Sequence, residues 1–295
     1  AAALPLSREE PLLAEEESNY QRAEELVSQG LLIPGRQGRF LFPRDPQVQQ
    51  GVPLRGSDMQ LQIMERGRRR AIGSIDRYRA CRETHPGAVY LHRGRTYVIE
   101  DIDFQEGTVL ARQRKVNYFT RVRTDKQTEI LSASSRKSLG DVDLFLGDLR
   151  VTERFTGYEK RLTKGKKLIS VLPLDLPPQI FETQGLWISL PSRIQEMVER
   201  DRHHFMGGIH ALEHLLIGIM PLIILTDRND LGGISHPLHP QLESPAVFVF
   251  DAHPGGVGLA SRAFAEPERL LRQAGQALDA CGCSHGCPFC IQSPK

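Results

Sequence analysis

Apolar residues near the start of the chain change from helical spacing to strand-like spacing. Between Glu15 and Gln29, the residues Ala23, Leu26 and Val27 lie among charged and amide side chains, and a glycine follows. Two short apolar runs then flank a Pro-Gly turn. A helix followed by strand, turn and strand predicts the back half of a winged helix, which we place at residues 1–53.

Short apolar runs separated by glycine, proline and charged turns dominate the middle of the chain. This pattern predicts a series of short strands, and their regular spacing is typical of a small barrel or meander. We therefore expect a barrel-like, β-rich domain at residues 54–165. The predicted strands cover residues 61–64, 88–91, 96–99, 108–110 and 117–120.

Longer apolar segments characterise the last part of the chain. The pattern predicts an amphipathic helix from Pro191 to Phe205, an apolar helix from Gly208 to Met220 and a strand from Ala246 to Asp251. A further helix is expected after Gly258, through Leu270 and Leu271 to about Leu278. These elements predict an α/β domain at residues 166–295, and the fold class expected for the chain is α+β and multidomain.

Basic residues are concentrated in the middle of the chain, although the net charge of the whole sequence is only +2. Residues 54–170 contain 25 basic and 15 acidic groups. Such an excess favours a polyanion, because Lys and Arg neutralise phosphates and release counter-ions. An ordinary solvated surface is the alternative. The candidate phosphate contacts are Arg68, Arg69, Arg70, Lys164, Lys166 and Lys167.

Aromatic residues are interleaved with these basic positions. Rings beside basic strands can stack on the bases of single-stranded nucleic acid. Packing in the core is the alternative, because alternate residues of a strand must face a core. The aromatic residues are Tyr78, Tyr90, Tyr97, Tyr118 and Phe119.

Length and composition describe a chain with enough apolar residues for several cores. The 295 residues are 40% hydrophobic and 25% charged. The sequence begins with Ala1 instead of methionine and carries no signal segment, so we expect a piece of a longer polypeptide. Four of its five cysteines lie within ten residues, which suits metal binding in a reducing compartment, the cytoplasm.

The cysteine cluster near the C-terminus carries the strongest chemical signal in the sequence. Four thiolates at this spacing, with glycine and proline to bend the backbone, predict one tetrahedral, structural Zn²⁺. An iron–sulfur cluster is the alternative, His285 could replace one sulfur, and a further ligand could follow Lys295. Cys81 is expected to be a small buried hydrophobe. The candidate zinc ligands are Cys281, Cys283, Cys287 and Cys290.

A second motif, His210, Glu213 and His214, matches the His-x-x-Glu-His pattern of inverted zinc peptidases. In such a hydrolase Glu213 would activate a zinc-bound water, and a third ligand would be needed. The flanking residues are apolar, which favours a buried helix whose polar groups brace its neighbours. The same polar residues argue against a membrane span.

A third motif is the strand that ends at Asp251 and His253, followed by a glycine-rich turn. Strand ends and glycine-rich turns before helices are frequent ligand sites, although the glycines can also serve tight turning alone. The sequence contains no G-x-x-x-x-G-K-[ST] motif. ATP hydrolysis by a P-loop is therefore not expected, and no catalytic residue is assigned to this chain.

Several of these motifs together resemble one known family. Residues 208–214, 226–233 and 250–259, with the cysteine cluster, are similar to the zinc-binding domain at the C-terminus of MrfA-type superfamily-2 DNA helicases. Residues 75–80 and 85–92 resemble the region that joins the motor of that family to its zinc domain.

The resemblance implies that the four cysteines bind zinc. It also implies that the chain cooperates with two ATP-driven, RecA-like motor domains of its parent, which translocate 3′ to 5′ along single-stranded DNA in DNA repair. Helicase activity then belongs to the parent. The acidic balance of the zinc domain departs from a DNA-binding surface, so we expect the basic middle to hold the strand and the zinc site to act as a scaffold.

Two other functions remain open from the sequence. One is a protein-interaction module of a repair or defence complex, and the other is the His-x-x-Glu-His metallohydrolase. For the zinc site, the sequence predicts that Cys283→Ser or Cys287→Ser unfolds the terminal domain, because the binding energy of the metal is part of the folding energy.

Overall fold

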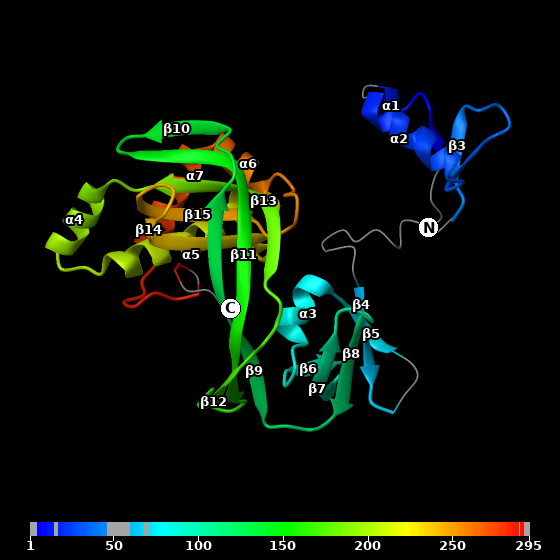
Figure 1. The fold of residues 1–295 in the computed structure, drawn as a ribbon. Coiled ribbons are helices and arrows are strands. Elements are labelled where there is room, and N and C mark those ends of the chain that lie inside the picture. Colours follow the sequence, from blue (N-terminus) through cyan, green and yellow to red (C-terminus); the bar gives the residue numbers. More distant parts are fainter. Residues whose placement is uncertain (1–4, 15–16, 46–59, 68–70, 289, 292–295) are drawn as a thin grey trace. The chain divides into compact units, whose positions relative to one another are not determined.

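The computed structural model describes residues 5–14, 17–45, 60–67, 71–288 and 290–291 (Figure 1). The chain divides into two units, Ala1–Asp58 and Met59–Lys295. The described strands form three sheets of mixed α+β architecture, one of them curled into a half-barrel. The domain boundary expected after residue 53 lies outside the described residues.

The first unit packs a helix on a small antiparallel sheet of order β1-β3-β2. Leu13, Ala23 and Leu41 form its buried core. The helix and both short strands expected from the sequence are confirmed. The elements are β1 (Leu6–Ser7), α1 (Pro11–Ala14), α2 (Glu17–Ser28), β2 (Leu32–Pro34) and β3 (Phe40–Pro43).

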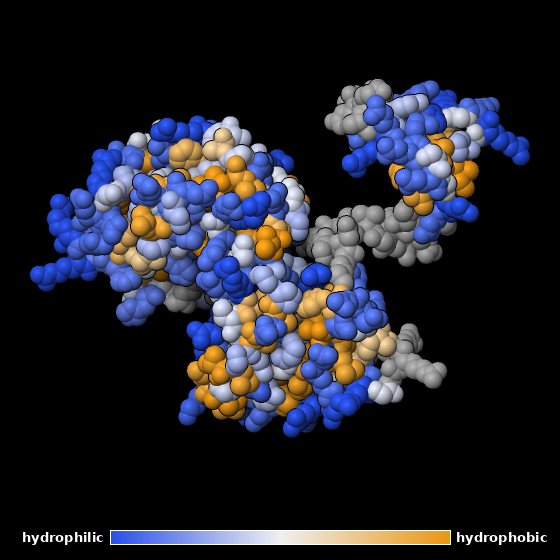
Figure 2. Space-filling view, in the orientation of Figure 1, coloured by the Kyte–Doolittle hydropathy of each residue, from blue (hydrophilic) through white to orange (hydrophobic). Residues whose placement is uncertain are grey.

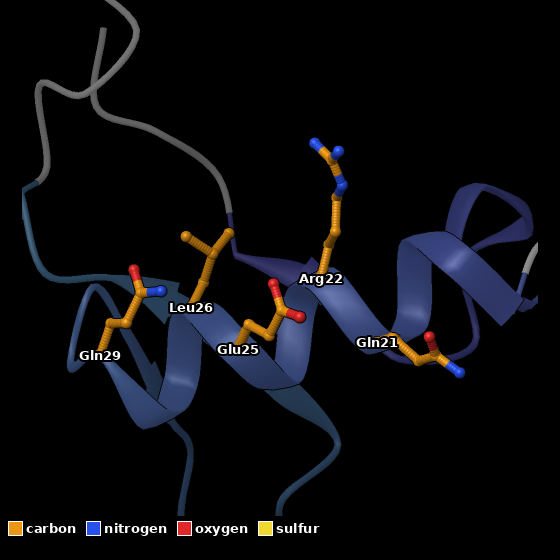
Figure 3. A pocket seen from close by; sticks show the side chains of 5 residues that line it. All are labelled: Gln21, Arg22, Glu25, Leu26 and Gln29. Carbon is orange, nitrogen blue, oxygen red and sulfur yellow. The ribbon is translucent and has the colours of Figure 1, made fainter.

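The pocket drawn in Figure 3 belongs to this unit. Its lining residues lie on α2 and at Gln29, which directly follows this helix, so it is an open helix face. Its two charged residues, Arg22 and Glu25, have opposite signs, so the pocket is not lined by charges of one sign. We assign no site to it. The lining residues are Gln21, Arg22, Glu25, Leu26 and Gln29.

The second unit begins with a five-stranded sheet of order β5-β4-β8-β7-β6. Only the β4–β8 pair is parallel. Leu61, Ile63 and Val109 are fully buried between the sheet and its covering elements. The path is that of an open sheet. Its elements are β4 (Gln60–Glu65), β5 (Ala71–Asp76), α3 (Arg77–Glu83), β6 (Val89–His92), β7 (Arg95–Asp103) and β8 (Thr108–Gln113).

The larger sheet of this unit has seven strands, all paired antiparallel. Its longest strand, β11, pairs with β10 and then β9 along one edge, and with β13 and then β12 along the other. Figure 1 shows β11 running through the unit. The strands are β9 (Tyr118–Ile130), β10 (Ser135–Leu139), β11 (Val142–Leu162), β12 (Leu168–Pro173), β13 (Gln179–Ser189), β14 (Leu231–His239) and β15 (Ser244–Asp251).

This sheet changes two expectations about the C-terminal part. Strands from both sides of the expected boundary at residues 165 and 166 belong to one sheet, because β11 pairs with β13. The expected α/β arrangement is also corrected. β14 and β15 form an antiparallel hairpin through a short turn, whereas a parallel pair needs a long crossover connection.

Five helical segments accompany the large sheet. α5 packs against β14, β15 and α7, and its buried side chains include Leu215, Leu216 and Met220. Together with Val247 and Val249 they belong to the main core of the unit. The helices are α4 (Ser192–Arg200), α5 (Phe205–Ile223), the 3₁₀ turn η2 (Arg228–Asp230), α6 (Leu259–Ala265) and α7 (Pro267–Asp279).

Two helix boundaries differ from the sequence prediction. The helix expected from Pro191 to Phe205 ends at Arg200, and α5 starts afresh where the His204 side chain accepts the N–H of Gly207. The helix expected to run to Leu278 is broken in two. Pro267 lacks an N–H and begins α7 at its first turn.

α5 is long and apolar enough, by length and composition, to cross a bilayer. Its packing on β14, β15 and α7 gives it the contacts of a core helix. Glu213 on this helix is 5% exposed, and the helix therefore also buries a charged side chain within the unit.

An ion pair with a buried carboxylate joins α3 to the large sheet of the second unit. Nη2 of Arg82, on α3, lies 2.5 Å and 2.7 Å from the two carboxylate oxygens of Glu153, on β11. Glu153 is completely buried. The hydroxyl of Tyr78 donates to Glu153 over 3.3 Å, and burial raises the pKa of Tyr78 to about 12. The pair thus fixes α3 against the large sheet.

Candidate metal centre and nucleic-acid interface

Four cysteine sulfurs gather at one point directly after α7. The Sγ–Sγ distances are 3.4 Å for Cys281 and Cys283, and 3.6 Å for Cys281 and Cys287. They are 3.5 Å for Cys283 and Cys290, and 3.8 Å for Cys287 and Cys290. The four atoms all lie within 4.8 Å of one another.

These distances fit a metal ion and not disulfide bonds. A disulfide would bring two sulfurs to about 2.0 Å, and all five cysteines of the chain are free. Zinc bonded to four thiolates at about 2.3 Å places the sulfurs about 3.8 Å apart. The His285 side chain does not belong to the grouped ligands among the described residues. The donor set is therefore four sulfurs, which fills a tetrahedral shell.

The local backbone brings the thiols together. The N–H of Cys281 donates to the carbonyl of Leu278 at the end of α7, over 3.1 Å. Gly286 adopts a φ of +79°, a left-handed conformation that favours glycine, just before Cys287. A turn then returns the N–H of Cys290 to the carbonyl of Cys287, over 3.1 Å. The loop thus closes on itself around the sulfurs.

Proton affinities differ within the cluster. The backbone N–H of Cys287 donates to Sγ of Cys290 over 3.3 Å, which lowers the pKa of Cys290 to about 7. The neighbouring thiols of Cys281 and Cys290 raise the pKa of Cys283 to about 12. Crowded thiolates repel one another, so a bound cation is what allows all four to be deprotonated together.

The His-x-x-Glu-His motif lies in the first half of α5. Nε2 of His210 and Nε2 of His214 are 3.1 Å apart, and Oε2 of Glu213 lies 3.3 Å from Nδ1 of His210. Burial raises the pKa of Glu213, while His210 opposes that rise. Within the part of the chain that the structure describes, no third metal-ligating side chain joins the pair. The geometry of a zinc hydrolase is therefore not assembled here.

The strand end at Asp251 is built as a structural anchor. Its buried carboxylate accepts the N–H groups of Val257, Leu259 and Ala260, over 2.6, 3.1 and 2.8 Å. Nε2 of His253 lies 3.1 Å from Oδ1 of Asp230. The carboxylate thus holds the glycine-rich turn and the first turn of α6, and the glycines serve the turn.

We expect Asp251→Asn to lower the free energy of unfolding by about 1–3 kcal/mol. The variant replaces one accepting carboxylate oxygen with a donating NH2 group, so that a buried backbone N–H loses its acceptor. Urea denaturation followed by circular dichroism measures the change. Asp175→Asn, on an exposed side chain, is the matched control. Equal midpoints for Asp251→Asn and the wild type would contradict the anchoring role.

Three of the candidate phosphate contacts gather at one hairpin tip. Lys164, Lys166 and Lys167 lie in the turn between β11 and β12, and all three are exposed. Lys166 has a φ of +52°, and Gly165 one of +73°. Among the residues that the structure describes, these lysines form no ion pair. Arg68, Arg69 and Arg70 lie outside the described residues.

Further features of this region were not predicted from the sequence. Arg121 and Arg123 are exposed at alternate positions of β9. Their spacing of two residues in the sequence could have predicted that both lie on one face of this strand. Apolar side chains gather over β12 beside the lysine turn (Figure 2), where Leu168, Ile169 and Val171 are exposed. The hairpin between β11 and β12 thus combines exposed lysines with apolar surface.

Two of the five aromatic residues serve as core. Tyr97 is 2% exposed in the core of the five-stranded sheet, and Tyr78 packs edge-on against Phe181. Tyr118 is half-buried near the lysine turn, where Nζ of Lys160 lies 5.4 Å from its ring centre. The core interpretation therefore holds for Tyr78 and Tyr97.

Comparison with known proteins gives matches among helicases. Residues 212–291 match the MrfA Zn-binding domain. The chain is 30% identical over 223 residues to the uncharacterized ATP-dependent helicase YprA of Bacillus subtilis, covering 75% of this chain and 29% of that protein. It is 26% identical over 234 residues to the ATP-dependent helicase hrq1 of Schizosaccharomyces pombe, covering 75% of this chain and 22% of that protein.

A crystal structure of the DUF1998 helicase MrfA bound to DNA matches 99% of this chain and 39% of that chain, with a TM-score of 0.59 and 25% identity. The chain spans less than a third of the length of the two curated relatives. The resemblance to the C-terminal region of MrfA-type helicases is confirmed. Because the cysteine cluster lies in the matched domain, the single structural zinc is confirmed as well.

Proposed function

We propose that this chain, the counterpart of the C-terminal region of MrfA-type helicases, guides single-stranded DNA for the motor domains of an ATP-dependent parent. One observation carries the proposal: three exposed lysines, which pair with no described acidic side chain, stand together at the β11–β12 turn. The likeness to a helicase structure bound to DNA supports it.

The chemistry of the hairpin tip suits a single strand. Lysines neutralise phosphates without reading sequence, and a single strand also exposes the faces of its bases. Leu168, Ile169 and Val171 offer apolar surface next to Lys164, Lys166 and Lys167. Arg161 is less suited to phosphate, because its Nε is 2.7 Å from a carboxylate oxygen of Glu159.

The remaining parts of the chain have supporting roles in this proposal. Cys281, Cys283, Cys287 and Cys290 hold the zinc, which fixes the end of the chain as a scaffold. α2, β2 and β3 form the back half of a winged helix. The parent is a cytoplasmic DNA-repair helicase whose RecA-like domains move 3′ to 5′. No residue of this chain acts in catalysis.

Replacing Lys164, Lys166 and Lys167 together with alanine is expected to weaken binding to a labelled single-stranded oligonucleotide. Each phosphate contact on single strands contributes about 0.7 to the slope of log K against log salt, so the triple variant is expected to lose about 2 from that slope. Fluorescence anisotropy across a salt series measures both effects.

A charge-matched control removes three exposed arginines elsewhere, Arg200, Arg262 and Arg272. An equal loss of affinity in both triple variants would show a general charge effect and no site at the hairpin. If the wild type holds one zinc per chain but does not bind the oligonucleotide, the protein-interaction module is favoured. The exposed Leu222 and Leu225 at the end of α5 are the observation in favour of that alternative.

A further inference from the structure

Two histidines face each other on the surface of α5. His210 and His214 are one helical turn apart, and their Nε2 atoms are 3.1 Å from one another. The ring centres are 4.5 Å apart with the planes at 74°. The side chain of His210 is 59% exposed, so a small ion can reach the pair from solvent.

We propose that His210 and His214 form a second site for a divalent transition metal, separate from the cysteine cluster. Imidazole nitrogens bind zinc at about 2.0–2.1 Å, and two ligands at a tetrahedral angle then lie about 3.4 Å apart. The observed 3.1 Å is close to that spacing. Histidines four residues apart on a helix are a known arrangement for binding one metal through both rings.

The other ring nitrogen of His210 is already oriented. Its Nδ1 lies 3.3 Å from Oε2 of Glu213 and 3.4 Å from Oγ of Ser235. When a metal occupies Nε2, the ring proton must be on Nδ1, where it donates to the Glu213 carboxylate. A carboxylate behind a ligating histidine fixes the tautomer and strengthens the ligand.

Glu213 is held firmly enough to act as this positioning residue. It is 5% exposed and packs across Gly233 of β14. A Cβ at Gly233 would lie only 2.8 Å from Cγ of Glu213, so the glycine makes room for the carboxylate. Glu213 contacts the side of the His210 ring remote from the metal position, and therefore it supports the ligand instead of activating a bound water.

The donor set defines the class of ion. Two neutral imidazoles suit Zn²⁺, Ni²⁺ or Cu²⁺, whereas Ca²⁺ and Mg²⁺ prefer oxygen ligands. Two protein ligands leave coordination positions open for water or for an oxygen of another molecule, such as a phosphate. The site differs in this from the closed cysteine cluster, which has four protein ligands.

Calorimetric titration of the tag-free, zinc-loaded chain with Ni²⁺ alone tests the proposal. We expect one Ni²⁺ to bind per chain while the zinc content stays at about one. His210→Ala and His214→Ala are each expected to weaken Ni²⁺ binding at least tenfold, and Glu213→Gln by about 10- to 100-fold. His203→Ala, on an exposed histidine ahead of α5, is the control and is expected to keep the affinity.

Thermal melts show whether each variant stays folded, which the exposed position of His210 favours. The proposal is overturned if the wild type binds no Ni²⁺ beyond its zinc, or if His210→Ala and His214→Ala bind it as tightly as His203→Ala does. Equal weakening by all three histidine variants would also overturn it, because the binding would then be unspecific.

Discussion

Replacing Cys287 with serine is expected to reduce the zinc content from about one per chain to near zero and to release residues 281–291 from the fold. The physical reason is that structural zinc contributes about 10–16 kcal/mol of apparent binding energy, which here orders a loop whose described residues form no helix or strand. Metal analysis and hydrogen exchange on the same sample measure the two effects.

The structure restricts how far this unfolding spreads. The main core comes from β11, β13, β14, β15 and helices α5 to α7, and Ile291 is the partly buried apolar residue that the loop packs against it. We therefore expect slow exchange to persist in β15, in place of the domain-wide unfolding expected from the sequence. Exchange protection lost throughout β13 and β15 would support the earlier expectation.

Cys81→Ala is the control for the zinc prediction. Cys81 is buried on α3 and is remote in sequence from the cluster, and burial raises its pKa to about 11. The variant is expected to lose some stability from a small cavity but to keep one zinc per chain. A loss of zinc in Cys81→Ala would mean that the metal depends on the fold as a whole.

Arg82→Met is expected to lower the free energy of unfolding by about 3 kcal/mol, because it leaves the completely buried carboxylate of Glu153 without its main partner. Lys126 lies opposite Glu153 in the register of β9 and β11, and its positive charge limits the loss of stability. Urea denaturation measures the difference from the wild type.

The double variant Arg82→Met with Glu153→Leu is the matched control. Replacing both members of a buried ion pair with apolar residues is often neutral for stability. Recovery of most of the lost free energy in the double variant is expected. If the double variant is as unstable as the sum of both single variants, the contact between α3 and the large sheet depends on packing and not on the ion pair.

The sequence predicted local elements better than their assembly. The strands at 61–64, 96–99 and 108–110 and the helix around Ala23 were visible because alternation and helical spacing are local signals. β13 was missed, although it pairs with both β11 and β15. Its core residues, such as Trp187, are buried by strands distant in sequence, so its role in the sheet could not be recognised from spacing.

The same contrast applies to the sites. Four cysteines within ten residues define a metal site almost by themselves, because covalent spacing alone keeps the sulfurs close. The anchoring role of Asp251 depends instead on how the turn after it folds back. The ion pair between Arg82 and Glu153 joins residues 71 positions apart, and no local sequence pattern predicts it.

The continuity of β11 has a mechanical consequence. At about 3.3 Å per residue, its 21 residues span roughly 70 Å of extended chain, with hydrogen-bonded partners along both edges. Pulling along this strand loads many ladder bonds in shear at the same time, whereas peeling a hairpin breaks them one after another. Force applied at the lysine turn is therefore carried along β11 into the large sheet that supports the zinc loop.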